Sequence, residues 1–172
     1  PKAAKDKEEE EDPLAKLTGL LDPSQAKPLM TLEQEKDFRA RKEPNYMRSA
    51  LKSLSPNNAI EQQIREGVKF RVERLTMPEN WPYMGNRTRE LVNDLDVFAD
   101  GAPRAREIAA AAAVEELGKL LFSDQPTVVK INAAGLLGRL NIQSINRTAN
   151  KPAVPYAPAA GPLIKVLGDS QQ

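Results

Sequence analysis

Two carboxylate pairs are the side chains of this sequence that come closest to a catalytic arrangement. Asp94 and Asp96 flank a leucine, and Glu115 and Glu116 are adjacent. General acid–base catalysis needs two such groups that converge on one substrate with separated pKa values. Neighbouring positions of a helix diverge by about 100°, so neither pair converges. We therefore predict that both pairs lie on solvated helix faces.

Other catalytic chemistries lack their side chains or their spacing. The 172 residues include no cysteine and no histidine, which excludes disulfides, thiol and imidazole catalysis, and zinc sites built on these ligands. Gly118-Lys119 lacks the upstream glycine and the following Ser or Thr of a phosphate-binding loop. We expect a protein that is not an enzyme, with no cofactor and no bound metal.

The composition favours an aliphatic core and a nearly neutral chain. Hydrophobic residues make up 40% of the chain, aromatic residues only 5%, and the net charge is +1. This small basic excess is too little to indicate a nucleic-acid partner. No apolar run approaches the roughly 20 residues that span a bilayer. The compartment stays open, with a lean toward an exported bacterial protein and a cytoplasmic location as the alternative.

The hydrophobic pattern predicts an all-α protein, because no segment shows sustained alternation bounded by hairpin turns. The charged tract 1–13, PKAAKDKEEEEDP, cannot bury apolar surface, and we assign residues 1–30 to a disordered or linker tail. Apolar residues at helical spacing predict helices over 31–42, 45–54, 58–75, 87–99, 104–122 and 126–140, and one that begins near 159.

The helix over 58–75 has the clearest amphipathic pattern. The apolar stripe of this helix consists of Ile60, Ile64, Val68, Val72 and Leu75. We expect Asn58 to cap the helix over 58–75 and Asn86 to cap the helix over 87–99. Basic side chains straddle this stripe, and we expect them to extend around the core toward solvent: Arg65, Lys69, Arg71 and Arg74.

Aromatic and methionine side chains gather in the Pro-rich segment TMPENWPYMGNR. Trp81 and Tyr83, with Met77 and Met84, could form an aromatic binding ledge. The favoured alternative is a small satellite core that holds this loop against the helices.

The segment DQPTVVKINAAGLLGRL, residues 124–140, is the most informative stretch. Its apolar stripe would face a partner helix, and Gly138 inside a helix indicates a tight backbone crossing. The stripe consists of Val129, Ala133, Leu136, Leu137 and Leu140.

This stretch resembles the second helix of a HEAT repeat. Residues 129–140 follow the V-[RK]-x-x-A-A-x-x-L-G-x-L pattern, after an aspartate turn at Asp124 and a proline at Pro126. Asp124 and Asp169 close similar helix ends 45 residues apart, a spacing typical of helix-pair repeats. The resemblance covers residues 104–172 and implies helical hairpins stacked as a short HEAT- or armadillo-like α-solenoid. Residues 101–172 would hold about one and a half repeats, and 31–100 a helical lead-in or cap.

This reading favours a non-catalytic scaffold that mediates protein–protein interaction. The candidate binding surface is the outward side of the 126–140 helix, with Asn132, Gly135 and Arg139, together with Trp81 and Tyr83. Two alternatives remain: an accessory or regulatory domain of a larger enzyme or electron-transfer protein, and a nucleic-acid-binding helical repeat.

The last helix would leave its apolar side chains uncovered, because no second helix follows it. We therefore expect the natural protein to continue beyond Gln172. We also expect an exposed apolar patch through which the chain could self-associate, formed by Leu163, Ile164, Val166 and Leu167.

Overall fold

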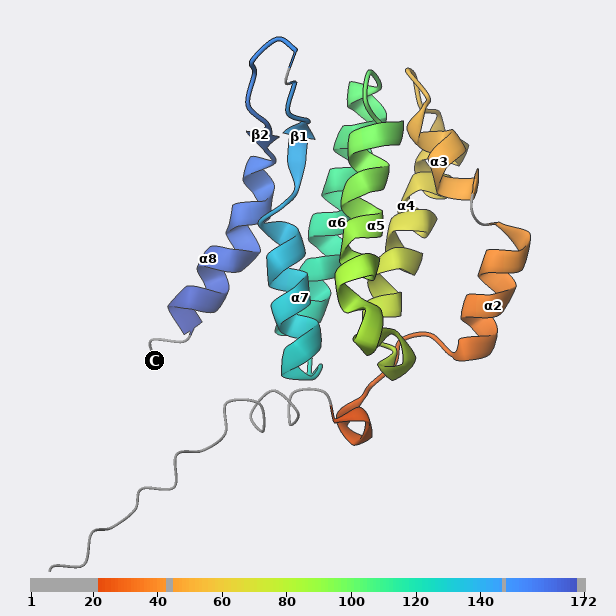
Figure 1. The fold of residues 1–172 in the computed structure, drawn as a ribbon, viewed down its shortest axis with the longest axis vertical. Helices are drawn as coiled ribbons and strands as arrows, with labels where there is room; N and C mark the ends of the chain where they lie inside the picture. Colours follow the sequence, from red (N-terminus) through yellow and green to blue (C-terminus); the bar gives the residue numbers. More distant parts are fainter. Residues whose placement is uncertain (1–21, 43–44, 147, 170–172) are drawn as a thin grey trace, which may run out of the picture.

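The computed structural model describes residues 22–42, 45–146 and 148–169 (Figure 1). It is mostly helical, which confirms the all-α prediction at this coarse level. The α-helices of the described residues are α2 (Leu32–Arg41), α3 (Asn45–Leu51), α4 (Asn58–Glu73), α5 (Met84–Phe98), α6 (Pro103–Phe122), α7 (Thr127–Leu137) and α8 (Ala160–Asp169). The charged tract 1–13, predicted to be disordered, lies outside the described residues.

The five helices from α4 to α8 run alternately down and up, so consecutive helices are antiparallel (Figure 1). α6 is the central helix and contacts α3, α4, α7 and α8. α5 packs against α3, α4 and α7, and in Figure 1 both α5 and α7 pass in front of α6. α2 and α8 lie at opposite sides of the body.

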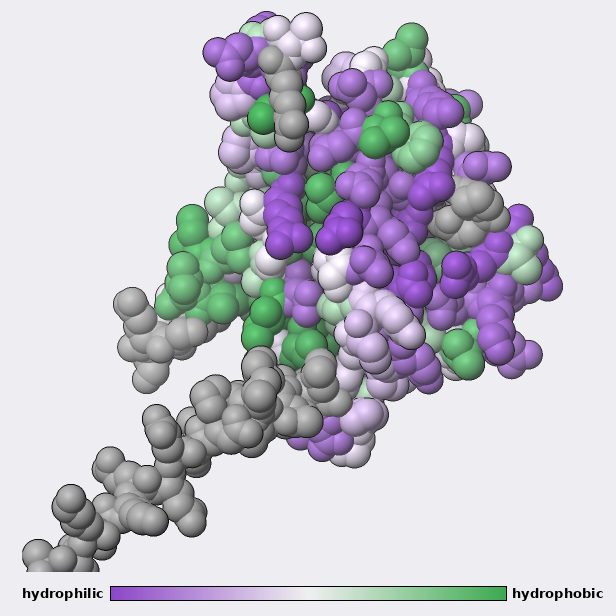
Figure 2. Space-filling view, in the orientation of Figure 1, coloured by the Kyte–Doolittle hydropathy of each residue, from purple (hydrophilic) through white to green (hydrophobic). Residues whose placement is uncertain are grey.

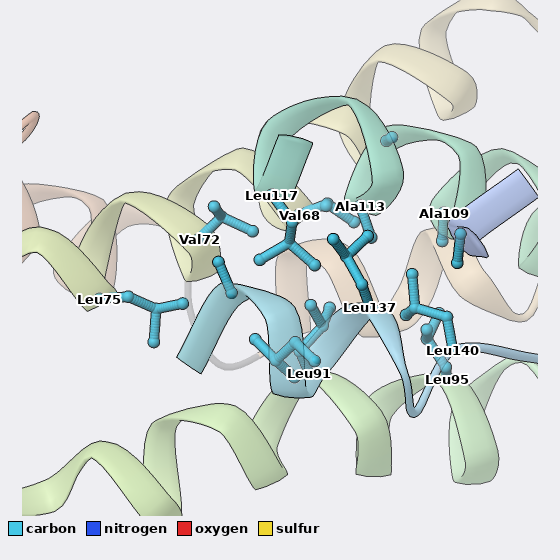
Figure 3. Close-up of a cluster of buried hydrophobic side chains, with 14 of the residues drawn as sticks. Val68, Val72, Leu75, Leu91, Leu95, Ala109, Ala113, Leu117, Leu137 and Leu140 are labelled. Atoms are coloured by element: carbon cyan, nitrogen blue, oxygen red, sulfur yellow. The ribbon is translucent and has the colours of Figure 1, made fainter. Parts of the chain in front are cut away.

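Alanine explains how α6 can have so many neighbours. Its centre is a run of alanines, and Ala109, Ala110 and Ala113 are completely buried. Alanine has the strongest helix propensity and the smallest side chain that still favours a helix, so adjacent helices approach closely. Larger side chains from α4, α5 and α7 fill the space around it, as Val68, Leu91 and Leu137 do in Figure 3. Burial of one such leucine contributes roughly 1.5–3 kcal/mol.

Both predicted apolar stripes face this core. In α4, Ile64, Val68 and Val72 are buried, Leu75 continues the stripe just after the helix, and Ile60 packs at its edge. The stripe of the segment 124–140 is buried at all five positions, namely Val129, Ala133, Leu136, Leu137 and Leu140. The stripes confirm the helical periodicity on which the all-α prediction was based.

Helix ends were predicted less accurately. Thr31 and Gln34 form a capping box at the start of α2, with Gln34 N donating to Thr31 Oγ1 at 3.1 Å. The cap of α4 is Asn57 rather than Asn58, and its Oδ1 accepts from Ile60 N at 3.0 Å. Asn86 is not a cap, because α5 already begins at Met84.

Among the described glycines, the one at a close helix crossing is Gly67, not Gly138. A Cβ atom at Gly67 would lie 2.4 Å from the Cβ of Met47, so α3 crosses α4 almost backbone to backbone. A Cβ at Gly138 would meet only carbonyl oxygens of its own helix, at 3.7 Å and beyond. Gly138 is exposed at the carboxyl end of α7, and the tight crossing predicted there is wrong. Ala133 is fully buried, as expected.

The connection between α7 and α8 contains two short antiparallel strands, β1 (Asn141–Gln143) and β2 (Val154–Pro155). Two contacts flank the paired strands. Tyr156 N donates to Leu140 O at 2.9 Å at one end, and an isolated bridge joins Asn146 and Lys151 at the other.

The chain before α2 is attached to the helical body at two places. Lys27 forms an ion pair with Asp124 in the α6–α7 turn, and Gln125 Nε2 donates to Lys27 O at 2.8 Å. Met30 is buried with Phe70 and Met77 in a second, smaller apolar cluster. Residues 22–30, part of the segment assigned to a disordered or linker tail, therefore contact the folded body through Lys27 and Met30.

Candidate functional site

A groove between α5 and α7 brings the three candidate residues of α7, Asn132, Gly135 and Arg139, together with residues of α5. Its volume is about 340 Å³. Figure 2 shows hydrophilic surface on both sides of a smaller apolar strip where these helices meet. The groove is lined by Gly85, Thr88, Arg89, Ile131, Asn132, Gly135, Leu136 and Arg139. We refer to this surface as the α5–α7 groove.

The core packing of α5 directs Arg89 outward. Leu91 and Leu95 are buried on the inner side of the helix. Thr88, which is buried, donates from its Oγ1 to Gly85 O at 3.1 Å, a bond within the helix. Arg89 lies on the opposite side and is exposed.

The same logic orients α7. Because Val129, Ala133 and Leu136 face the core, Gly135 and Arg139 are exposed on the other side. Asn132 is half-buried, and its Nδ2 donates to Val128 O at 2.8 Å, which leaves its Oδ1 as an acceptor.

An apolar side chain and a bare backbone complete the groove. Ile131 is 56% exposed, and no atom lies within 4 Å of a Cβ placed at Gly135. The floor of the groove at Gly135 is therefore open backbone, to which an extended peptide could lie close.

The arginines of the groove differ from the other arginines that the structure describes. Each of the others forms an ion pair with a described carboxylate. Arg89 and Arg139 form none within residues 22–42, 45–146 and 148–169, and no acidic residue lines the groove. The α5–α7 groove thus holds two exposed guanidinium groups that are available to an outside carboxylate.

A more open hollow on α5 adjoins the groove and shares Arg89 with it. The hollow is lined by Tyr83, Asn86, Arg87, Arg89, Glu90 and Asn93. Tyr83 is 57% exposed, as a binding residue should be. Trp81 is buried, and its Nε1 donates to Leu75 O at 3.2 Å, so it does not belong to the surface.

The favoured satellite-core interpretation of this segment therefore holds for Trp81, Met77 and Met84, which are all buried. The aromatic ledge is wrong for Trp81, because its ring packs inward and its polar atom is already satisfied by a backbone carbonyl. Tyr83 alone of this group faces outward among the described residues.

A buried ionic network, which sequence reasoning missed, joins α2, α3, α4 and α5. Arg71 Nη2 lies 2.6 Å from Asp94 Oδ2, and Arg48 Nε of α3 donates to the other oxygen of Asp94 at 3.0 Å. Arg74, which directly follows α4, donates from its Nε to Glu35 Oε1 at 2.7 Å and from its Nη1 to Glu90 Oε2 at 2.9 Å. The six side chains tie four helices together at fixed positions.

Two predictions about charged side chains fail here. Asp94 is 1% exposed, so the solvated-face prediction is wrong for this residue. Arg71 and Arg74 are also buried and do not extend to solvent, because carboxylates on neighbouring helices compensate their charge inside the protein.

Glu90 shows how strongly this network fixes charge. Burial by itself raises the pKa of Glu90, but the charges of Arg74, Arg87 and Arg71 outweigh it and hold the pKa below its ordinary value. Arg87 contributes a hydrogen bond to Glu90 Oε1 at 2.8 Å. The network therefore keeps this carboxylate ionised at neutral pH.

The remaining predicted carboxylates have separate structural partners. Asp96 Oδ1 accepts from the buried Arg106 at 2.6 Å and from Ser144 Oγ at 2.8 Å, and so points away from Asp94. Glu115 and Glu116 both bind Lys119, and their hydrogen bonds raise its pKa to about 12.

The hollow of about 640 Å³ near Arg106 is larger than the α5–α7 groove but carries compensated charge. It lies between the α5–α6 turn and the β1–β2 loop, and its lining includes Asp100 and Lys151. Its buried cation, Arg106, is already paired with Asp96, and the two other charged side chains of the lining, Asp100 and Lys151, have opposite signs. Within the described residues, no group of three His, Cys, Asp or Glu side chains could hold a metal ion.

The apolar surface predicted on the last helix is exposed in part. Ile164 and Leu167 are 66% and 68% exposed and form the apolar patch over α8 in Figure 2. Leu163 and Val166 are half-buried against the core. Self-association through this helix stays a prediction. No described helix is both long and apolar enough to cross a membrane.

No family model, no curated protein and no solved structure matches this chain. The HEAT resemblance therefore remains an expectation from residues 104–172.

Proposed function

We propose that this protein is a non-catalytic helical-repeat scaffold that binds a carboxylate-bearing segment of another protein in the α5–α7 groove. Antiparallel α4–α5 and α6–α7 hairpins that pack side by side support the solenoid arrangement. In such an arrangement equivalent helices of successive hairpins line one continuous surface, and grooves between them accommodate extended chains.

The observation that carries this proposal is the pair of arginines without a described carboxylate partner. Arg89 and Arg139 lie on different helices and line the same groove. A guanidinium binds a carboxylate through two parallel hydrogen bonds, which gives orientation as well as affinity. Two such groups on facing helices select a segment that carries two acidic side chains.

The rest of the groove suits the parts of a peptide between those acids. Ile131 offers exposed apolar surface, and Asn132 Oδ1 can accept from a backbone N–H. Gly135 has no side chain that would hold a peptide backbone away from the helix. An extended acidic peptide with an occasional apolar residue fits these features.

Binding of a fluorescein-labelled hexaglutamate peptide, measured by anisotropy, tests the proposal. We expect saturable binding to the full chain and none for hexaglutamine. R89E and R139E should each weaken it about tenfold, equivalent to about 1.4 kcal/mol. K36E is the charge-matched control, since Lys36 is exposed on α2 and far from the groove. Equal losses in R89E and K36E would show that the peptide senses net charge and not the groove.

A further inference from the structure

We propose that the chain's own acidic tract, Glu8–Asp12, occupies the α5–α7 groove and competes there with the partner segment. This inference rests on the proposed function, because it assigns a second, intramolecular occupant to the same site. The tract lies outside the described residues, and its sequence is EEEED.

The acidic tract and the α5–α7 groove carry opposite charges. The tract has five consecutive acidic residues, the longest such run in the sequence. The groove has two arginines and no acidic lining residue, whereas the other described arginines already have carboxylate partners. The most acidic segment of the chain thus matches a surface whose two arginines lack a described carboxylate partner.

The place where the tract is attached is the second argument. The ion pair of Lys27 with Asp124 and the hydrogen bond from Gln125 fix the chain beside the amino end of α7. Pro126 and Thr127 line the same small hollow as Gln25 and Lys27. The tail therefore leaves the folded body next to the helix that forms one wall of the groove.

The connecting length is sufficient. Residues 13–21 link the tract to Asp22, and nine residues span at most about 30 Å when extended. The stretch of α7 from Thr127 to Arg139 is about 18 Å long, at 1.5 Å per residue. The extended link is thus longer than the stretch of α7 that separates its amino end from Arg139.

The tether makes even a weak contact effective. A short linker gives an attached segment an effective concentration in the millimolar range. A groove with a dissociation constant of about 100 μM would then be mostly occupied, and an outside peptide would bind about tenfold more weakly than to an empty groove. Added salt would reduce this difference, because exposed charges are screened within about 3 Å at 1 M ionic strength.

The test compares the full chain with the full-length variant E8Q/E9Q/E10Q/E11Q/D12N in the hexaglutamate assay. We expect the variant to bind the peptide about tenfold more tightly. E33Q/E79Q is the control for a general loss of negative charge, because both side chains are exposed and form no ion pair within the described residues. It should bind like the wild type.

The outcomes separate the two proposals. If the wild type and the neutralised variant bind the peptide equally, the tract does not occupy the groove, and the proposed function stands. If neither binds saturably, the proposed function itself is wrong. If the neutralised variant binds more tightly but R89E/R139E preserves the difference, the tract acts elsewhere and the inference fails.

A second measurement locates the tract directly. The chain has no cysteine, so A4C provides a single site for a nitroxide spin label near the tract. We expect the label to broaden the amide resonances of Gly135 and Arg139, and neutralisation of the tract to restore them. Equal broadening with and without the five charges would overturn the inference.

Discussion

The two sides of α5 place arginines in opposite situations. On the inner side Glu90 and Asp94 hold Arg71 and Arg74 in a buried network. On the outer side Arg89 lines a groove with Arg139 and has no carboxylate partner within the described residues. A buried cation must be compensated inside the protein, whereas an exposed cation is solvated by water and stays accessible to another molecule. Pairing therefore separates structural arginines from those available for binding.

The buried network also fixes which helices pack together. Desolvation offsets much of the attraction in a buried ion pair, so a network contributes less to net stability than its short distances suggest. Loss of a single member is nevertheless costly, because the remaining charge is left without compensation. This asymmetry gives the comparison its clearest tests.

The largest effect is expected for D94A. The substitution removes the carboxylate that Arg71 and Arg48 share and leaves a buried guanidinium with reduced compensation. We expect a loss of about 3–5 kcal/mol in the free energy of unfolding, measured by urea denaturation. D37A, which removes an exposed pair with Arg41, should cost less than about 1 kcal/mol. Similar losses in the two variants would refute the distinction between buried and exposed pairs.

R74K tests whether the shape of the guanidinium matters as well as its charge. Arg74 bridges Glu35 on α2 and Glu90 on α5 with two different nitrogens, which one ammonium group cannot reproduce. We expect a loss of about 2–3 kcal/mol in thermal or urea unfolding. The matched control is R89K in the groove, which should leave stability unchanged. A stability of R74K equal to that of the wild type would mean that charge alone suffices.

The pH dependence of stability provides a smaller effect. Because the folded-state pKa of Glu90 lies below its ordinary value, its contribution is complete above the ordinary pKa of about 4.3. It is lost as the pH falls through the lowered folded-state pKa. We expect E90Q to be about 1–2 kcal/mol less stable than the wild type at pH 7. This gap should narrow as the pH falls below the ordinary pKa and through the lowered one, in urea titrations at each pH. A gap that stays constant would mean that the ionised carboxylate is not what stabilises the network.

The smallest effect on stability is expected in the groove. R89A and R139A remove exposed cations that have no described carboxylate partner, so the free energy of unfolding should change by less than about 0.5 kcal/mol. Both variants should still lose affinity for the acidic peptide. If either variant unfolds at clearly lower urea concentration, that arginine supports the fold and the comparison breaks down.

Periodicity predicted most of the helical core. The stripes of α4 and α7 follow from the spacing of apolar residues along one segment, and local spacing is what sequence reasoning reads well. The same reasoning placed Asn132, Gly135 and Arg139 on the outward side of α7, where they line the groove. It did not identify Arg89, whose position beside them depends on how α5 packs against α7.

The errors share a physical cause, which is dependence on distant partners. Asp94 can be buried because Arg48 and Arg71 compensate its charge. Arg48 is 46 residues away in sequence, and Arg71 lies on another helix. A local pattern cannot show such a pairing, so an aspartate in a helix was assigned to solvent. Gly138 was misjudged for the converse reason, since a small residue indicates a close crossing only where another helix is present, as at Gly67.

The position of α6 determines how the molecule opens. Because neighbours cover α6 on several sides, its central amide hydrogens near Ala109 and Ala113 can meet solvent only when the whole domain comes apart. α8 has neighbours on one side only, so it can detach while the other helices stay folded. Deuterium uptake would therefore proceed inward from the carboxyl-terminal edge and reach the alanine run last.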